Sequence, residues 1–218
     1  MKWIAQGNTA EIYEYSENLI CKLFYSGYPS DYVKHEFYNA TVAEKLGIRT
    51  PKAYEIIVDN EREGIVYDKI VGEELYHKLD GNMDASFAVW MDKFVGFHKQ
   101  LLQYRINNVM DYKDFLRMFA MDKVTLAKID MLADDNCFIH GDFHLGNVMV
   151  DETDSLVLID MMNVCKGPAL YDIARTYFLL KYDTNIQNEY LMRMECALED
   201  IMPYLDVILA IRENEMKR

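Results

Sequence analysis

A short segment with the sequence FIHGDFHLGNVMVD, residues 138–151, concentrates chemically active side chains in this 218-residue chain. His140, Asp142 and His144 alternate along it, so in an extended strand they would share one face and could hold a divalent metal ion. The other histidines of the chain lie in helical or loop patterns without a paired ligand. The segment therefore also allows a second hypothesis, in which Asp142 acts on a substrate and the histidines support the loop.

The second hypothesis is phosphoryl transfer, and it accounts for more residues of the segment. This reaction needs a carboxylate near the acceptor hydroxyl and oxygen ligands for the magnesium that bridges the phosphates. Asp142 and Asn147 have the spacing of the Asp and Asn in a kinase catalytic loop. Asp160 ends the apolar run LVLI on the far strand of a predicted hairpin, where a second metal ligand is expected. Each residue alone would be interpreted as a loop or capping residue, but their order and spacing together favour catalysis.

The pattern HGDFHLGNVMVD, followed by LVLIDMMNVCKGPALYDIAR, resembles the HGDxHxxN motif and downstream aspartate of the aminoglycoside phosphotransferase and choline kinase superfamily. The resemblance implies a protein-kinase-like, two-lobed α+β fold with a β-rich N-lobe and a mainly helical C-lobe. It implies an enzyme that transfers the γ-phosphate of ATP, with GTP also open as donor, to a hydroxyl of a small molecule, with Mg²⁺ as cofactor. Asp142 would be the catalytic base, and Asn147 and Asp160 would be the metal ligands.

The N-terminal part of the chain would then position the nucleotide. β-type runs at residues 11–15, 19–24, 53–59 and 64–71 predict strands. Residues 28–47 predict a helix with Ser30 as its N-cap and Gly47 as its stop. Because Gly72 follows the last strand, we expect an N-lobe at residues 1–71 and a C-lobe at residues 72–218.

The resemblance also assigns nucleotide-binding residues within this N-lobe. Lys22 would contact the α- and β-phosphates and would be held by Glu36 of the following helix, with Glu44 as the fallback partner. The turn that would cover the phosphates lacks the G-x-G-x-x-G pattern of protein kinases, but small polar residues can still present N–H groups to phosphate oxygens. The residues of this turn are Gly7, Asn8 and Thr9.

The segment VYDKIVGEEL resembles the hinge between the two lobes of such kinases. Backbone groups of Asp68 and Ile70 would meet the purine edge. Tyr67 would lie either at the back of the base pocket, where it would narrow the slot, or in the core of the N-lobe. Because Tyr67 at the back of the base pocket would narrow the slot for the base, GTP stays open as a donor.

After residue 72 the pattern becomes helical. Apolar residues step by three and four from Phe87 to Leu102, and again from Ile186 to Ile201 before Pro203. Between them, residues 147–150 and 156–160 predict a hairpin joined by the polar loop DETDS. Only a few residues separate Asp160 from Gly167 and Pro168, which leaves no room for an activation loop, so we expect a constitutively active enzyme. We interpret Asp172 as structural, capping the helix that follows and supporting the catalytic loop.

The charge of the chain constrains its partners. Asp and Glu outnumber Lys and Arg by 36 to 23, and the basic residues are scattered, so we expect no nucleic-acid and no membrane partner. An acidic surface suits a cationic acceptor, such as an aminoglycoside or an amino alcohol. The four cysteines are far apart and no signal-peptide or membrane-span pattern is present, which predicts free thiols and a cytoplasmic protein. The oligomeric state and the choice between a resistance enzyme and a metabolic kinase stay open.

Two alternative functions remain beside the small-molecule kinase. One is a nucleotide-binding pseudokinase that acts as a regulatory module, although a pseudokinase usually lacks one of the residues retained here as Lys22, Asp142, Asn147 and Asp160. The other is a metal-dependent hydrolase built on His140, Asp142 and His144. Tightly bound zinc or manganese without nucleotide affinity would favour the hydrolase.

Overall fold

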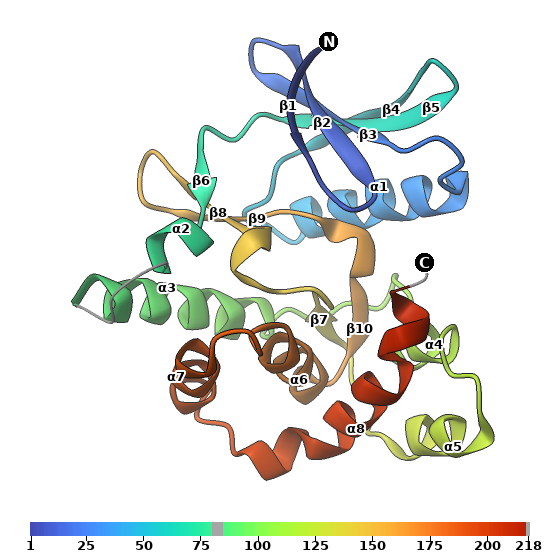
Figure 1. Cartoon of the computed structure of the whole chain (residues 1–218), viewed down its shortest axis with the longest axis vertical. Coiled ribbons are helices and arrows are strands. Elements are labelled where there is room, and N and C mark those ends of the chain that lie inside the picture. Colours follow the sequence, from blue (N-terminus) through green and yellow to red (C-terminus); the bar gives the residue numbers. More distant parts are fainter. Residues whose placement is uncertain (80–84, 217–218) are drawn as a thin grey trace. The chain divides into compact units, whose positions relative to one another are not determined.

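The computed structural model describes residues 1–79 and 85–216, and the chain divides into two compact units (Figure 1). Unit 1 comprises Met1–Glu74 and Val148–Met162, and unit 2 comprises Leu75–Asn147 and Asn163–Arg218. Strands dominate the N-terminal region and helices dominate the C-terminal part, which confirms the predicted α+β fold. The lobe boundary after residue 71 stays a prediction, and the hairpin that it assigned to the C-lobe groups with unit 1.

The main sheet of unit 1 is antiparallel and has the strand order β1-β2-β3-β5-β4. Its strands are β1 (Lys2–Gln6), β2 (Ala10–Ser16), β3 (Leu19–Phe24), β4 (Ala53–Asp59) and β5 (Arg62–Asp68). The four predicted strands are present at nearly the predicted bounds. Strand β1 was not predicted, because its sequence KWIAQ is exposed throughout and carries no alternating pattern.

Helix α1 (Ser30–Lys45) contacts β4 and β5 of this sheet. Its N-cap is Pro29, and the Ser30 hydroxyl instead donates a hydrogen bond to Glu63 at 2.9 Å, so the predicted capping role of Ser30 is wrong. Gly47 adopts a φ of 77° just after the helix, as predicted for its stop. Two polar residues, Glu36 and Asn39, are buried on the inner face beside Val33, Ala40 and Ala43. Buried polar side chains need partners, and both serve the site described below.

The predicted hairpin is present, and it forms a small sheet with the order β6-β8-β9. These strands are β6 (Gly72–Glu74), β8 (Val148–Asp151) and β9 (Leu156–Leu158). Val148 pairs with Leu158, and the Asp151 carboxylate closes the loop by accepting the N–H groups of Thr153 and Ser155. A Cβ atom at Gly72 would lie 2.1 Å from the Val150 carbonyl oxygen, so only glycine allows this close strand approach.

Unit 2 consists mainly of helices. They are α2 (Tyr76–Leu79), α3 (Ala85–Leu101), α4 (Tyr112–Arg117), α5 (Lys123–Met131), α6 (Ala169–Leu179), α7 (Thr184–Met194) and α8 (Leu198–Glu215). Strands β7 (Cys137–Ile139) and β10 (Cys165–Gly167) pair beside them and were not predicted, because three residues are too few for a pattern. The helix predicted from Phe87 is confirmed as α3.

The helix predicted to run from Ile186 to Ile201 is two helices in the structure. Glu195 adopts a left-handed conformation with a φ of 58° and ends α7, and α8 begins three residues later. Pro203 lies inside α8 rather than after a helix end. The apolar period continues across the break, which is why periodicity alone joined the two helices.

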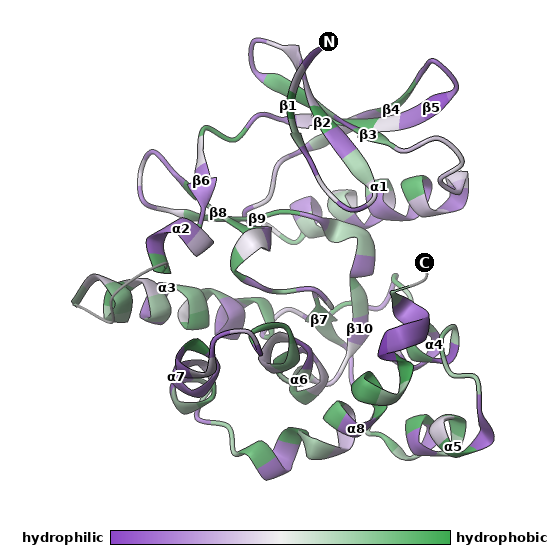
Figure 2. Cartoon of the chain, in the orientation of Figure 1, coloured by the Kyte–Doolittle hydropathy of each residue, from purple (hydrophilic) through white to green (hydrophobic). Residues whose placement is uncertain are grey.

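Most of the buried residues of α3, α6 and α8 are apolar. Figure 2 shows hydrophilic residues at the last turn of α8. All four cysteines lie in the described part of the chain and are free thiols, as predicted. Within the same residues, no helix combines the length and the hydropathy that crossing a membrane would require.

Candidate active site

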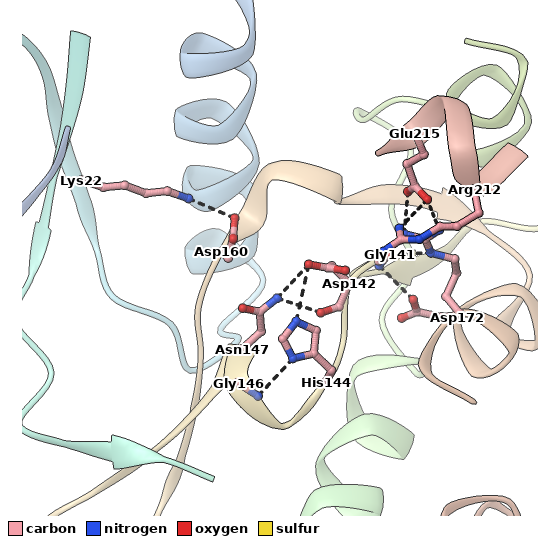
Figure 3. Close-up of polar contacts among 11 residues, drawn as sticks. Lys22, Gly141, Asp142, His144, Gly146, Asn147, Asp160, Asp172, Arg212 and Glu215 are labelled. Carbon is pink, nitrogen blue, oxygen red and sulfur yellow. Dashed lines mark hydrogen bonds and ion pairs between the residues drawn. The ribbon is translucent and has the colours of Figure 1, made fainter. Parts of the chain in front are cut away.

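A lysine-centred cluster occupies unit 1 between β3 and α1. The Nζ atom of Lys22 lies 2.7 and 2.9 Å from the two carboxylate oxygens of Glu36. It also lies 3.0 Å from Oδ1 of Asp160 (Figure 3). The ion pair expected between Lys22 and Glu36 is therefore present. The fallback partner, Glu44, is exposed.

Burial sets the electrostatics of this cluster. The Glu36 side chain is 1% exposed and that of Lys22 is 13% exposed. Burial disfavours the ammonium ion, but the adjacent carboxylates of Asp160 and Glu36 outweigh it and raise the pKa of Lys22 above its ordinary value. Lys22 is therefore charged at physiological pH.

Tyr67 completes the cluster from β5. Its hydroxyl donates to Oε1 of Glu36 at 3.1 Å, and the residue is 8% exposed. Of the two positions open from the sequence, the structure supports the one in the core. Tyr67 and Lys22 together fix the Glu36 carboxylate, and burial raises the pKa of Glu36 although the hydrogen bonds from both partners oppose that rise.

The backbone around Asp160 is also constrained. Asp160 adopts a φ of 64°, a left-handed conformation that is uncommon for residues with a Cβ atom. The next residue, Met161, is held by its carbonyl, which accepts a hydrogen bond of 2.9 Å from the buried amide of Asn39. Strained conformations of this kind persist where the surroundings impose them, and they are common at functional sites.

A second cluster surrounds Asp142 in unit 2. The amide nitrogen of Asn147 donates to the carboxylate of Asp142 at 3.1 Å and to its backbone carbonyl at 2.9 Å (Figure 3). Both amide hydrogens of Asn147 are thereby used, so its Oδ1 atom is the atom of the amide that remains to bind a cation. Phe143 is fully buried and stacks on Phe94 and on His98, which anchors the loop below Asp142.

The ring of His144 faces the same carboxylate. Its Nδ1 atom accepts the backbone N–H of Gly146 at 3.1 Å, and its Nε2 atom lies 3.7 Å from Oδ2 of Asp142. Burial opposes ionisation of Asp142, but the His144 ring and the positive field of Arg175 and His140 lower the pKa of Asp142 to about 2. Asp142 is therefore a carboxylate at physiological pH.

Gly141, the residue before Asp142, is held on both sides. Its N–H donates to Asp172 at 2.9 Å and its carbonyl accepts from Nε of Arg175 at 3.0 Å. It adopts a φ of 75°, and a Cβ atom there would lie 2.6 Å from the carbonyl oxygen of Asn163. Only glycine suits this position.

Asp172 holds the loop from below. Its carboxylate accepts the N–H groups of His140 and Gly141 and lies 3.1 Å from Nε2 of His98, whose Nδ1 is 2.8 Å from the hydroxyl of Tyr190. The support of the catalytic loop was expected, but the capping role is wrong, because Asp172 lies within α6 and the N-cap is Pro168.

Sequence reasoning missed His98, Tyr190 and Arg175, all of which are buried. The available signal was a histidine on the apolar face of α3, since a buried polar side chain implies a hydrogen-bond partner.

The metal-ligand hypothesis for His140, Asp142 and His144 receives no support from this geometry. His140 is fully buried, and His144 uses one ring nitrogen to accept Gly146. Across residues 1–79 and 85–216, no group of three or more His, Cys, Asp or Glu side chains is arranged to hold a metal ion. A magnesium ion bound largely through substrate phosphates needs fewer protein ligands.

The predicted phosphate-covering turn joins β1 to β2. The N–H of Gly7 closes the turn on the carbonyl of Ala10 at 2.8 Å, and the Gly7 carbonyl accepts the hydroxyl of Tyr25 at 2.9 Å. Gly7 therefore shapes the turn with its own backbone groups. Asn8 is exposed and Thr9 is half-buried, and the N–H groups of both are without a partner in the described part of the chain.

The predicted hinge follows the end of β5. The N–H of Asp68 donates to the carbonyl of Lys52 at 3.1 Å, and its carboxylate accepts the N–H of Lys52 and the hydroxyl of Tyr54. Ile70 lies two residues later, outside regular secondary structure, and is half-buried. The N–H of Asp68 is thus occupied, whereas that of Ile70 has no partner among the residues described.

Comparisons with known proteins identify the family of the chain. A model of the phosphotransferase enzyme family matches residues 4–204. No curated protein matches the sequence.

Solved structures share the fold at low sequence identity. A thermostable mutant of aminoglycoside phosphotransferase APH(4)-Ia has a TM-score of 0.68 and 11% identity, with 98% of this chain and 84% of that chain covered. The choline kinase LicA from Streptococcus pneumoniae has a TM-score of 0.65 and 15% identity, with 100% and 86% covered. An aminoglycoside-3'-phosphotransferase of type VIII has a TM-score of 0.65 and 16% identity, with 98% and 93% covered.

Proposed function

The chain belongs to the phosphotransferase enzyme family and is a small-molecule kinase, and on this basis we propose its reaction, donor and site. It transfers the γ-phosphate of ATP, or of GTP, to a hydroxyl of a small cationic molecule. The observation that carries the proposal is the pair of preorganised carboxylates: Asp160 held by Lys22, and Asp142 held by Asn147. Such positioning is the main requirement of phosphoryl transfer.

Unit 1 would bind the nucleotide. Lys22 would offset the negative charge of the α- and β-phosphates, and Glu36 would keep its ammonium group in place. The free N–H groups of Asn8 and Thr9, with Gly7 shaping their turn, would meet phosphate oxygens. The Ile70 N–H and the Asp68 carbonyl would bind the purine edge. Structural neighbours in complex with ADP and with AMP-PNP support nucleotide as the donor class.

Asp142 would be the catalytic base. Its low pKa keeps it ionised, so it would orient the acceptor hydroxyl by accepting a hydrogen bond and would receive the proton late in the transfer. Asn147 would keep the carboxylate from rotating away, since its amide binds both the side chain and the backbone of Asp142. A weak base is suitable here, because a loose transition state leaves the hydroxyl protonated until late.

The residues that would hold Mg²⁺ are Asn147 and Asp160, which flank the same hairpin in the sequence. The donor set fits this ion. The amide nitrogen of Asn147 donates to Asp142, so the Oδ1 atom of the same amide remains to bind a cation. The Asp160 side chain is 37% exposed. Carboxylate and amide oxygens are the hard ligands that Mg²⁺ prefers. When bound, the ion would neutralise charge on the nucleotide phosphates.

A cationic acceptor follows from charge. The formal net charge of −13 attracts cations and repels anions. Among structural neighbours, one structure contains hygromycin B, another contains gentamicin, and a third is a choline kinase, which supports amines with hydroxyl groups as the acceptor class.

The test is release of ADP and GDP in the presence of Mg²⁺ with a panel of aminoglycosides, amino alcohols and amino sugars. Asp142→Asn is the matched control, because it keeps the size of the side chain and removes its charge. The proposal expects turnover with one acceptor class that is lost in the variant. Nucleotide binding without turnover of any acceptor would favour the regulatory pseudokinase, and absence of nucleotide binding at millimolar concentration would refute the proposal.

A further inference from the structure

The guanidinium of Arg175 is buried in unit 2, with its side chain 1% exposed. Its Nε atom donates to the carbonyl of Gly141 at 3.0 Å. That carbonyl belongs to the peptide group that joins Gly141 to Asp142. Arg175 therefore holds the orientation of the peptide plane directly before the proposed base.

A buried guanidinium needs a counter-charge, and Glu215 supplies it. The two carboxylate oxygens of Glu215 accept from Nη1 and Nη2 of Arg175 at 2.9 and 2.7 Å. This bidentate arrangement is the strongest geometry for such a pair. Nη1 of Arg212, labelled beside Glu215 in Figure 3, donates to the same carboxylate at 2.7 Å. Burial raises the pKa of Glu215, but Arg175 and Arg212 together outweigh burial and the pKa falls below its ordinary value, so the carboxylate is charged.

Glu215 comes from a distant part of the sequence. It is the last residue of α8, in the hydrophilic turn seen in Figure 2. The match to the family model ends at residue 204, so this turn is not part of what that model describes. Glu215 is nevertheless connected to the catalytic loop through one side chain, Arg175. Helices α6 and α8, which carry these two residues, pack against each other.

We propose that Glu215 is a positioning residue for Asp142, acting through Arg175 and the Gly141 carbonyl. The proposal rests on the catalytic role proposed above for Asp142. Without Glu215, the guanidinium would keep a buried charge with one partner fewer, and it would turn toward water or another acceptor. The Gly141 carbonyl would then lose its donor, and the peptide plane directly before Asp142 would no longer be held.

The variant Glu215→Gln tests this proposal, and Asp206→Asn is its matched control. Asp206 lies on the same helix and loses the same charge, but its partner is the surface residue Lys128 at 3.4 Å. We expect Glu215→Gln to lower kcat by about 10- to 100-fold, since small misplacements of a catalytic group have effects of this size. The KM for nucleotide should not change, because Lys22 and its partners belong to unit 1. Glu215→Asp should restore part of kcat, and Asp206→Asn should match the wild type.

Hydrogen–deuterium exchange provides a readout that does not need turnover. Residues 138–147 should exchange faster in Glu215→Gln than in Asp206→Asn, whereas residues of α1 should exchange equally. Unchanged exchange in 138–147 overturns the proposal. So does a kcat that falls only in proportion to the folded fraction, which circular dichroism measures at the assay temperature.

Two further outcomes can be distinguished from each other: the failure of a variant to fold and the failure of the proposed function. If Glu215→Gln does not fold, Glu215→Asp becomes the test variant, and a wild-type kcat and wild-type exchange in it overturn the proposal. If Asp142→Asn retains turnover, the proposed function fails, and the exchange experiment still decides whether Glu215 positions the loop.

Discussion

Lys22 and Glu36 form a two-pronged ion pair, with Nζ 2.7 and 2.9 Å from the two carboxylate oxygens. The pair joins β3 to α1 within unit 1, and the hydroxyl of Tyr67 donates to the same carboxylate. The ammonium group is therefore fixed before any ligand arrives. Fixing a charge in advance removes a cost of reorganisation from the reaction.

Lys22→Met should abolish turnover, because no other cation in unit 1 is held in this position. It should also reduce the free energy of unfolding by about 3 kcal/mol, since Glu36 is left buried without its counter-charge. Tyr67→Phe is the control: it removes one hydrogen bond from Glu36 and should cost about 1 kcal/mol. Urea unfolding and nucleotide turnover measure both effects. Full turnover in Lys22→Met would contradict the assignment.

Asp172→Asn should destabilise the catalytic loop. The amide has one acceptor oxygen where the carboxylate has two, so at least one buried N–H of His140 or Gly141 loses its partner, at a cost of about 1–3 kcal/mol. Burial opposes the charge of Asp172, but His98 and the loop N–H groups lower its pKa.

The pKa of Asp172 also sets a pH dependence. A carboxyl group with a lowered pKa adds stability above its ordinary pKa of about 3.9, and that stability is lost as the pH falls toward the folded value. Chemical unfolding at pH 7 and at pH 3, which lies below that ordinary value, should therefore show a smaller difference in the variant. Tyr190→Phe, which removes the hydroxyl next to His98 and leaves Asp172 itself unchanged, is the control, and an equal effect in both variants would contradict the role of Asp172.

His144 should determine the pH at which Asp142 loses its charge. In His144→Asn, the side-chain oxygen still accepts the Gly146 N–H, but no atom reaches Asp142. In His144→Gln, the side-chain amide can place a donor near Asp142. Because the His144 ring helps to lower the pKa of Asp142 to about 2, we expect a higher pKa in His144→Asn. The acidic limb of the kcat profile should then move to higher pH in that variant and less in His144→Gln. Identical profiles would show that His144 has no electrostatic role.

Removal of Mg²⁺ should stop turnover without unfolding the protein. The proposed ligands already have protein partners, Asn147 on Asp142 and Asp160 on Lys22, so the ion is not needed to hold either side chain. Excess EDTA should therefore abolish ADP release and leave the melting temperature of the free protein unchanged. Added Mg²⁺ should restore turnover. ADP release that persists in EDTA would rule out the metal role of both residues.

The residues proposed for catalysis and metal binding were predictable because they lie at characteristic spacings within short segments of the sequence. Asp142 and Asn147 are five residues apart and Asp160 ends a readable hairpin, so short segments carry the signal. The order of elements likewise placed Lys22 on a strand and Glu36 on the next helix. The family resemblance carried by these segments implied the fold class and the pairing of Lys22 with Glu36, whereas the contacts of Asn147 with Asp142 and of Lys22 with Asp160 were not predicted.

The supporting residues could not be predicted in the same way. His98 and Asp172 are 74 positions apart, and Arg175 and Glu215 are 40 apart, so only the tertiary fold brings them together. The break at Glu195 depends on one left-handed residue within a continuing apolar period. Strand β1 is fully exposed, and its hydrogen bonds to β2 rather than burial define it.

The most direct test of the central claim is transfer of a labelled γ-phosphate to an acceptor by wild-type protein and by Asp142→Asn, with nucleotide affinity measured on the same samples. The account predicts a phosphorylated acceptor with the wild type, a loss of at least about 100-fold in the variant, and equal nucleotide affinity in both. Equal transfer by the two proteins would contradict it, because Asp142 would then not be the base.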